Sequence, residues 1–133
     1  MVSLDSINLQ RGKEMIVGIG IDITEIGRVR SAVKKNPRFL DKVLTNEELA
    51  QTSKMNEKRK MEYAAGRFSA KESYSKALGS GLGSKVQFSD LAIVDNENGK
   101  PEFLRHPFDG KAHISISHTK DLVVTEVILE RES

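Results

Sequence analysis

The chain has 133 residues, no cysteine and a formal net charge of +2. A disulfide framework and a thiolate metal site are therefore excluded, and so small a net charge does not by itself indicate a nucleic-acid-binding protein. No apolar run approaches the length of a membrane-spanning helix, so we predict no contact with a membrane. The length suits one domain, and the lack of cysteine fits a reducing compartment, so we predict a cytoplasmic protein.

The first element predicted along the chain is a buried strand. Residues 1–14 show no periodicity, and we interpret them as an N-terminal extension of a domain that covers residues 15–133. The run "MIVGIGIDI" that follows is rich in Ile and Val, which predicts a strand. Gly18 and Gly20 alternate within it, which indicates that another backbone or a ligand comes close. Asp22 ends the run, where an unpaired carboxylate would be costly.

Helices are predicted next. The segment "TEIGRVRSAVKK" predicts a short helix capped by Thr24. The segment "LTNEELAQTS" predicts another, in which Thr45 and Glu48 have the spacing of a capping box. Residues 56–78 favour one long helix, and Gly79 is in the position of its C-cap.

The remaining elements are predicted to be strands. The segment "LAIVDNENGKPEFL" predicts a hairpin with a polar turn at residues 96–99, and "KAHISISHTKDLVVTEVILE" predicts two strands joined near residues 119–121. This order indicates a single α+β domain with a largely antiparallel sheet. Strand alternation places Ser117 and His118 on opposite faces, and a histidine in such a place is more often structural than a ligand.

The long helix contains a candidate site. Met61, Ala65, Phe68 and Glu72 are spaced to share one face, and Lys76 lies one turn further along it. A solvated Glu–Lys pair contributes only about 0.3–0.5 kcal/mol and is expected on the polar face instead. A carboxylate on the inward face needs a partner, which favours a functional site over an ordinary ion pair.

Asp22 and Glu72 come from separate elements and are candidates to share a hard divalent cation. Mg²⁺ prefers oxygen ligands, keeps several waters and often binds one or two carboxylates plus substrate phosphates. The alternative for Asp22 is a charge at the N-terminus of the helix that follows it.

Cations crowd one segment of the chain. This segment is either a solvated helix of mixed charge or a surface for phosphates or an acidic protein. Beside Arg67, Lys71 and Lys76, the backbone amides of the "GSGLG" loop are candidates to help hold phosphates. The cations are Lys54, Lys58, Arg59, Lys60, Arg67, Lys71 and Lys76.

Three stretches, "GIGIDITEIGRV", "GRFSAKESYSKALGSGLG" and "HISISHTKDLVVTEVILE", together resemble the holo-acyl-carrier-protein synthases. These are the short, single-domain members of the phosphopantetheinyl transferase superfamily. The resemblance covers the chain from residue 15 to about residue 130. It implies an antiparallel sheet packed on a long central helix, and a trimer with active sites between subunits. The implied reaction transfers 4′-phosphopantetheine from coenzyme A to a serine of an acyl carrier protein and releases adenosine 3′,5′-bisphosphate.

The resemblance also implies residue roles. Asp22 and Glu72 match the family's magnesium ligands, with Mn²⁺ as an alternative ion, and Lys76 matches a lysine that contacts phosphates or aids proton transfer. These three are the expected catalytic residues. Arg28 matches a basic position that docks the acidic carrier protein. The expected substrate-binding residues are Arg67, Lys76, Gly79, Gly81, Ser117 and His118.

Some points stay open in the sequence. Thr24 stands where the larger two-lobed transferases carry a third acid, so water and phosphate are the expected remaining metal ligands. The general base is Glu72, a metal-bound water or a carboxylate such as Asp41 of a neighbouring subunit.

Two other classes of protein remain as alternatives. A small basic nucleic-acid-binding domain would use the cations but give Asp22 and Glu72 no role, and the segment lacks the aromatic platform common in single-strand binders. A non-catalytic scaffold that docks acyl carrier proteins is the second alternative, and the presence of Asp22, Glu72 and Lys76 together argues against it.

Overall fold

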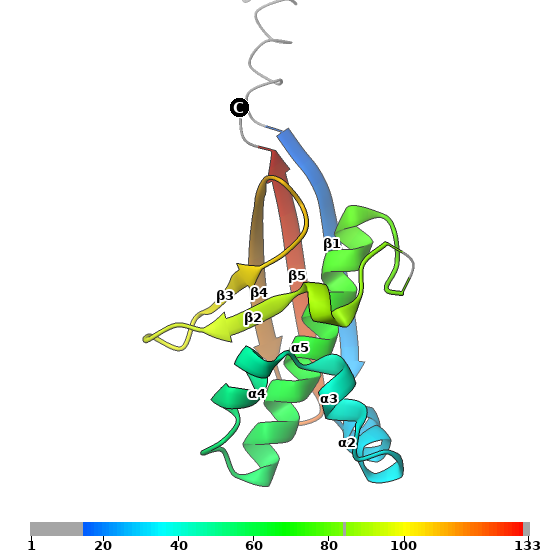
Figure 1. Cartoon of the computed structure of the whole chain (residues 1–133), viewed down its shortest axis with the longest axis vertical. Helices are drawn as coiled ribbons and strands as arrows, with labels where there is room; N and C mark the ends of the chain where they lie inside the picture. The colour runs from blue at the N-terminus through cyan, green and yellow to red at the C-terminus, as the bar shows by residue number, and fades with distance from the viewer. Residues whose placement is uncertain (1–14, 84, 132–133) are drawn as a thin grey trace, which may run out of the picture.

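Four α-helices and two antiparallel sheets form the part of the chain that this computed structural model describes, residues 15–83 and 85–131 (Figure 1). The predicted extension, residues 1–14, lies outside it. None of the described helices is long and apolar enough to cross a membrane. In chain order the elements are β1 (Met15–Glu25), α2 (Ile26–Lys35), α3 (Phe39–Val43), α4 (Asn46–Gln51), α5 (Glu57–Leu78), the 3₁₀ helix η1 (Phe88–Asp90), β2 (Ala92–Asp95), β3 (Pro101–Arg105), β4 (Lys111–His118) and β5 (Leu122–Arg131).

The sheets have simple topology. The larger sheet has the order β1-β5-β4 and the smaller pairs β2 with β3, with all neighbours antiparallel. The predicted α+β class, the hairpin and the two C-terminal strands are therefore confirmed. The short helices α3 and η1 were not predicted, because five and three residues are too few to show a period.

The predicted helix caps are confirmed with one exception. Gly79 caps the C-terminal end of α5, and the capping box of α4 is present. The N-cap of α5 is Asn56, the first residue of the predicted helix. The exception is α2, which begins after Glu25 with no side-chain cap. The predicted cap by Thr24 is wrong because Thr24 belongs to β1, where its hydroxyl donates to Asp22 Oδ2 at 2.6 Å.

β1 lies directly against the backbone of α5. A methyl group at Gly20 would overlap the carbonyl oxygen of Ser73, and one at Gly18 would overlap that of Ala77. The close approach predicted from the two glycines is therefore confirmed, and the neighbour is a helix backbone. Because alternate residues of a strand share a face, Asp22 also points toward α5.

α5 is buried on nearly every side. It packs on β1 and β5 on one side, and α2 and α3 cover part of the other (Figure 1). Tyr63, Ala64 and Ala65 are consecutive and therefore point about 100° apart around the helix axis, yet each is at most 1% exposed. The predicted division of this helix into an inward face and a polar face is therefore wrong, and burial alone does not single out Glu72.

The larger sheet has a face that points away from α5, and the β1 side of this face is apolar and not covered by the described part of the chain. Ile19, Ile21 and Ile23 of β1 are each more than half exposed. They pair across the sheet with Ile128, Glu126 and Val124 of β5. A contiguous apolar patch of this kind marks a surface for association.

Gly20→Ala is expected to destabilise the protein, because the added methyl group would overlap the Ser73 carbonyl. Overpacking of this kind costs typically about 1–3 kcal/mol of unfolding free energy. Gly27→Ala is the control, since nothing lies within 4 Å of its added methyl group on α2, and it should be neutral or stabilising by about 1 kcal/mol. Urea unfolding compares the two variants, and equal stabilities would contradict this packing.

Candidate functional site

Asp22 is the centre of a polar cluster between β1 and α5. Its Oδ2 accepts hydrogen bonds from the hydroxyls of Thr24 at 2.6 Å and Ser69 at 2.8 Å. Its Oδ1 accepts from Lys76 Nζ at 3.2 Å, and the same ammonium donates to the carbonyl of Ile21 at 3.0 Å. The Asp22 side chain is 13% exposed and that of Lys76 is 52% exposed. Oδ2 is thus fixed by two hydroxyl groups, whereas Oδ1 bonds to the ammonium of an exposed side chain.

Glu72 lies one helical turn before Lys76 and lines a cavity of about 270 Å³ together with Asp22. Burial raises the pKa of Glu72, the negative charge of Asp22 raises it further, and Lys76 acts in the opposite direction. Two carboxylates that repel each other beside one cation are a donor set that a divalent ion would stabilise.

The residues present therefore fit Mg²⁺ with an incomplete set of protein ligands. Asp22 and Glu72 both supply hard oxygen donors, as this ion prefers. Across residues 15–83 and 85–131, no group of three or more His, Cys, Asp or Glu side chains is arranged to hold a metal. Two carboxylates would leave the other coordination positions to water and to substrate phosphates.

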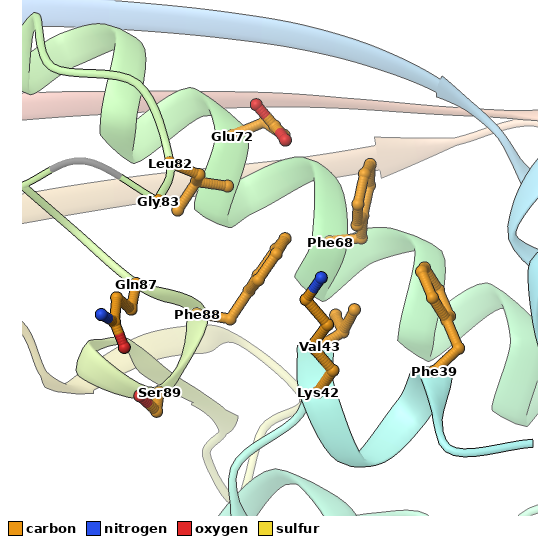
Figure 2. Close-up of a pocket in the computed structure, with 10 residues that line it drawn as sticks. All are labelled: Phe39, Lys42, Val43, Phe68, Glu72, Leu82, Gly83, Gln87, Phe88 and Ser89. Carbon is orange, nitrogen blue, oxygen red and sulfur yellow. The ribbon is translucent and has the colours of Figure 1, made fainter. Parts of the chain in front are cut away.

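An apolar pocket of about 630 Å³ opens beside Glu72 (Figure 2). The rings of Phe39, Phe68 and Phe88 line it, with the Phe68 centroid 6.2 Å from Phe39 and 5.8 Å from Phe88. The side chains of Glu72 and Lys42 are its charged groups. The candidate metal site therefore adjoins a volume suited to an apolar or weakly polar part of a substrate.

Arg28 lies beside Asp22 and Glu72. It is exposed on α2 and lines the smaller cavity that contains Asp22 and Glu72. The last turn of α2 adds Lys34 and Lys35. The predicted docking residue thus belongs to a basic helix next to the acidic pair.

Arg67 and His118 lie together, but in a different pocket. That pocket has a volume of about 290 Å³ and also includes Arg59. Residues 67 and 72 are five positions apart on α5, which turns them about 140° from each other around the helix axis. Within one chain, the pocket of Arg67 and the cluster around Glu72 are therefore on different sides of α5.

The Arg67 guanidinium is fixed by contacts within the chain. It is 3% exposed, donates from Nη2 to Asp95 Oδ1 at 2.8 Å and from Nε to the Ile93 carbonyl at 2.9 Å, and stacks 3.9 Å over the Tyr63 ring. It forms a rigid wall of the pocket, whereas the side chains of His118 and Arg59 are each 44% exposed.

The other expected substrate-binding residues do not line the pockets described above. Ser117 points to the opposite face of β4 from His118, as strand alternation predicted. Gly79 and Gly81 form the start of the loop after α5, with φ angles of 82° and 72°. Only glycine adopts such angles at no steric cost, so both positions are needed for the turn whether or not they bind a ligand.

Lys71 has a structural role and does not bind phosphates as predicted. It is fully buried, and its ammonium donates to Glu48 Oε1 at 2.7 Å and to the carbonyls of Val43 at 2.7 Å and Phe88 at 3.2 Å. Burial lowers the pKa of Lys71, and the carboxylate of Glu48 opposes this effect. The expectation that Lys71 helps to hold phosphates is wrong, because it ties α5 to α4 and to the segment before β2.

Sequence reasoning missed Ser69 as a member of the site. Ser69 follows the same helix period as Glu72 and Lys76, at positions i, i+3 and i+7. That spacing was a usable signal, but serine is common in helices and carries no charge. The apolar rings of Phe39 and Phe88 were missed because they come from the two short helices that were not predicted.

The comparisons with known proteins show the family of the chain. The family model of the 4′-phosphopantetheinyl transferase superfamily matches residues 18–128, and the chain belongs to this superfamily. Within it, a holo-[acyl-carrier-protein] synthase of Limosilactobacillus fermentum is 58% identical over 117 residues, 88% of this chain and 98% of that relative. The resemblance to holo-acyl-carrier-protein synthases is therefore confirmed.

Two solved structures extend the comparison. A holo-(acyl-carrier-protein) synthase of Bacillus anthracis, in complex with CoA (3′,5′-ADP), has a TM-score of 0.82 and 41% identity, covering 89% of this chain and 99% of that one. The synthase of Helicobacter pylori, in complex with coenzyme A, has a TM-score of 0.74 and 29% identity, covering 84% and 98%.

Glu72→Gln is expected to raise the melting temperature of the metal-free protein near neutral pH. A carboxyl group whose pKa is raised by folding adds stability below its unfolded pKa, and this contribution is lost as the pH rises through the folded pKa. The variant has no carboxyl group at this position and so does not lose this stability. Its gain in melting temperature over the wild type should shrink as the pH falls toward 4.5, the ordinary pKa of the carboxyl group. Thermal unfolding in EDTA over a pH series measures the effect. A variant less stable than the wild type at neutral pH would mean that the surroundings favour the charged carboxylate.

Proposed function

We propose that this chain is a holo-[acyl-carrier-protein] synthase. It transfers 4′-phosphopantetheine from coenzyme A to a serine of an apo-acyl carrier protein and releases adenosine 3′,5′-bisphosphate. The observation that carries the proposal is the cluster of Asp22, Glu72 and Lys76 between β1 and α5, in a chain 58% identical to a relative named for this activity.

Asp22 and Glu72 would hold Mg²⁺ or Mn²⁺, both of which accept carboxylate oxygens. When bound, such an ion would neutralise negative charge on the pyrophosphate of coenzyme A. Lys76 is exposed and bonded to Asp22 Oδ1 and a carbonyl, so its ammonium could turn to the phosphates where a bound divalent cation would compensate the charge of Asp22. There it would stabilise the charge that develops on the leaving bisphosphate.

The serine hydroxyl of the carrier must lose a proton as it attacks phosphorus. Glu72 is one candidate acceptor, since its carboxylate lines the cavity that contains Asp22. Asp41 is exposed on α3 and is the alternative base if a neighbouring subunit supplies it.

The separation of the two pockets supports a site built between subunits. Arg59, Arg67 and His118 suit the adenosine 3′-phosphate end of coenzyme A, whereas Asp22 and Glu72 suit its pyrophosphate. Since these groups lie on different sides of α5 in one chain, one coenzyme A molecule would contact both where two chains meet. The uncovered apolar face of the larger sheet supports association into the trimer expected from the resemblance.

Arg28 and the basic end of α2 would dock the acidic carrier protein. Their positive field would raise the association rate and make it sensitive to salt. We propose a cytoplasmic location, which the absence of cysteine fits.

The alternative of a nucleic-acid-binding domain is less well supported. Its basic segment loses Arg67 and Lys71, which are buried in ion pairs with Asp95 and Glu48. The non-catalytic scaffold is separated from the enzyme by turnover.

The proposal is tested by a mass spectrum of an apo-acyl carrier protein after incubation with this protein, coenzyme A and Mg²⁺. A phosphopantetheine increment is expected, and EDTA should abolish it. Asp22→Asn should abolish it with an unchanged circular dichroism spectrum, while Asp109→Asn, at an exposed aspartate between β3 and β4, should not. No increment on a carrier that another synthase modifies in parallel would contradict the proposal.

A site shared between subunits predicts complementation. Asp22→Asn removes one half of the site, and the double variant Arg59→Ala/His118→Ala removes the other half. Each should be inactive alone. After unfolding and refolding as a mixture, roughly a quarter of the wild-type rate should return, since that share of interfaces receives one intact half from each chain. A mixed assembly without recovered activity would contradict the shared site.

A further inference from the structure

A chain of buried hydroxyl groups runs from α5 and β5 to the carboxylate of Asp22. Ser73 Oγ lies 2.6 Å from Thr125 Oγ1, which lies 2.9 Å from Ser69 Oγ, and Ser69 donates to Asp22 Oδ2 at 2.8 Å. The three hydroxyl residues are at most 1% exposed. Buried hydroxyls are costly unless bonded, and no buried side-chain N or O atom in the described residues lacks a partner. The serines and threonine therefore form one satisfied network.

The carboxylate sets the direction of the hydrogen bonds in this network. An ionised Asp22 only accepts, so the single hydroxyl proton of Ser69 goes to Oδ2. If both hydroxyl contacts are hydrogen bonds, Thr125 donates its own proton to Ser69, and Ser73 donates to Thr125 Oγ1 at 2.6 Å, with a longer contact of 3.1 Å to the Thr125 carbonyl. All three O–H dipoles point along the chain toward Asp22, and each bond polarises the next.

Thr24 completes the arrangement from the strand side. Its hydroxyl donates to the same Oδ2 at 2.6 Å, so that oxygen accepts from two fixed donors, one on β1 and one on α5. The other oxygen, Oδ1, accepts from the exposed ammonium of Lys76. The exposed Lys76 side chain can change its conformation. If Thr24 or Ser69 turned away from Asp22, its buried hydroxyl would lose this hydrogen bond.

We infer that Ser69 and Thr24 are positioning residues, which hold Oδ2 of Asp22 so that Oδ1 is presented as a single-oxygen ligand to the divalent cation. Without these donors the carboxyl group would be free to rotate about its Cβ–Cγ bond. The carboxylate would then have to be ordered when the ion binds, at a cost in binding free energy. The inference deepens the proposed function and rests on its metal site at Asp22 and Glu72.

The test measures Mn²⁺ binding without turnover. Electron paramagnetic resonance reports free Mn²⁺ during titration of the wild type, Ser69→Ala and Thr24→Val, with coenzyme A present, no carrier protein, and a coenzyme A blank subtracted. Loss of a group that orients a metal ligand typically weakens binding 10- to 100-fold, so each variant should raise the Mn²⁺ dissociation constant about tenfold or more. In the transfer assay the KM for the ion should rise similarly, while kcat at saturating ion stays near that of the wild type.

Ser73→Ala is the matched control. Ser73 is as buried as Ser69, lies on the same helix and bonds to the same Thr125 hydroxyl, but makes no hydrogen bond to Asp22. It should lose a similar amount of stability, about 1 kcal/mol, with little change in Mn²⁺ affinity. Equal weakening by the Ser69 and Ser73 changes would show a general structural effect and overturn the inference. If Ser69→Ala fails to fold, the nearly isosteric Thr24→Val decides.

Asp22→Asn separates the failure of this inference from failure of the proposed function. Wild type that binds no Mn²⁺, or Asp22→Asn that binds it as tightly, would overturn the metal site and both proposals with it. Binding that Asp22→Asn abolishes but Ser69→Ala and Thr24→Val leave unchanged would overturn the positioning role alone.

Discussion

The backbone contact between β1 and α5 is the constraint on which the candidate site depends. Gly18 and Gly20 have no side chains, so the strand lies against the carbonyl groups of the helix. Asp22, the next residue on that face, therefore reaches the hydroxyl of Ser69 and the ammonium of Lys76. A strand held further away by larger side chains would leave Asp22 without these partners and separate it from the acidic residue of the helix. The glycines thus determine the geometry of the site without belonging to it.

Buried and half-buried charges serve two different purposes in this chain. Lys71 and Glu48 are fully buried, close together and completely hydrogen bonded, and they join α5 to α4. Asp22 and Glu72 are partly exposed, and the pKa of Glu72 is raised first by its burial and further by repulsion from Asp22. Such repulsion destabilises a site that only supports the fold. In a site for a cation and phosphates, the repulsion would disappear when the cation binds. Burial and charge pairing together therefore distinguish the charged side chains that stabilise the fold from the charged side chains of the candidate site.

Local signals made much of the fold predictable. The Ile/Val run, the capping box and the glycine after α5 each depend on neighbours in sequence, and the predicted strand, box and C-cap are confirmed. The predicted burial of the strand is wrong within this chain, because Ile19, Ile21 and Ile23 point away from α5 and are more than half exposed. Burial of Lys71 was not predictable, because its partner Glu48 and the carbonyls it binds come from distant segments. Thr24 was assigned to a cap because a threonine before a helical segment is a common N-cap, and the sequence does not show that β1 continues to Glu25. The pairing of Asp22 with Glu72 was inferred from their chemistry and from the resemblance. The separation of Arg67 from them was not predictable, because it depends on how α5 packs in the fold.

The most direct test of the central claim is a crystal structure with Mn²⁺ and coenzyme A, with the ion located by anomalous diffraction. The account predicts an anomalous peak between Asp22 Oδ1 and the Glu72 carboxylate, in contact with the pyrophosphate. It also predicts that the adenosine 3′-phosphate lies in the pocket of Arg67 and His118 of a neighbouring chain. A peak away from both carboxylates, or a coenzyme A molecule bound within a single chain, would contradict it.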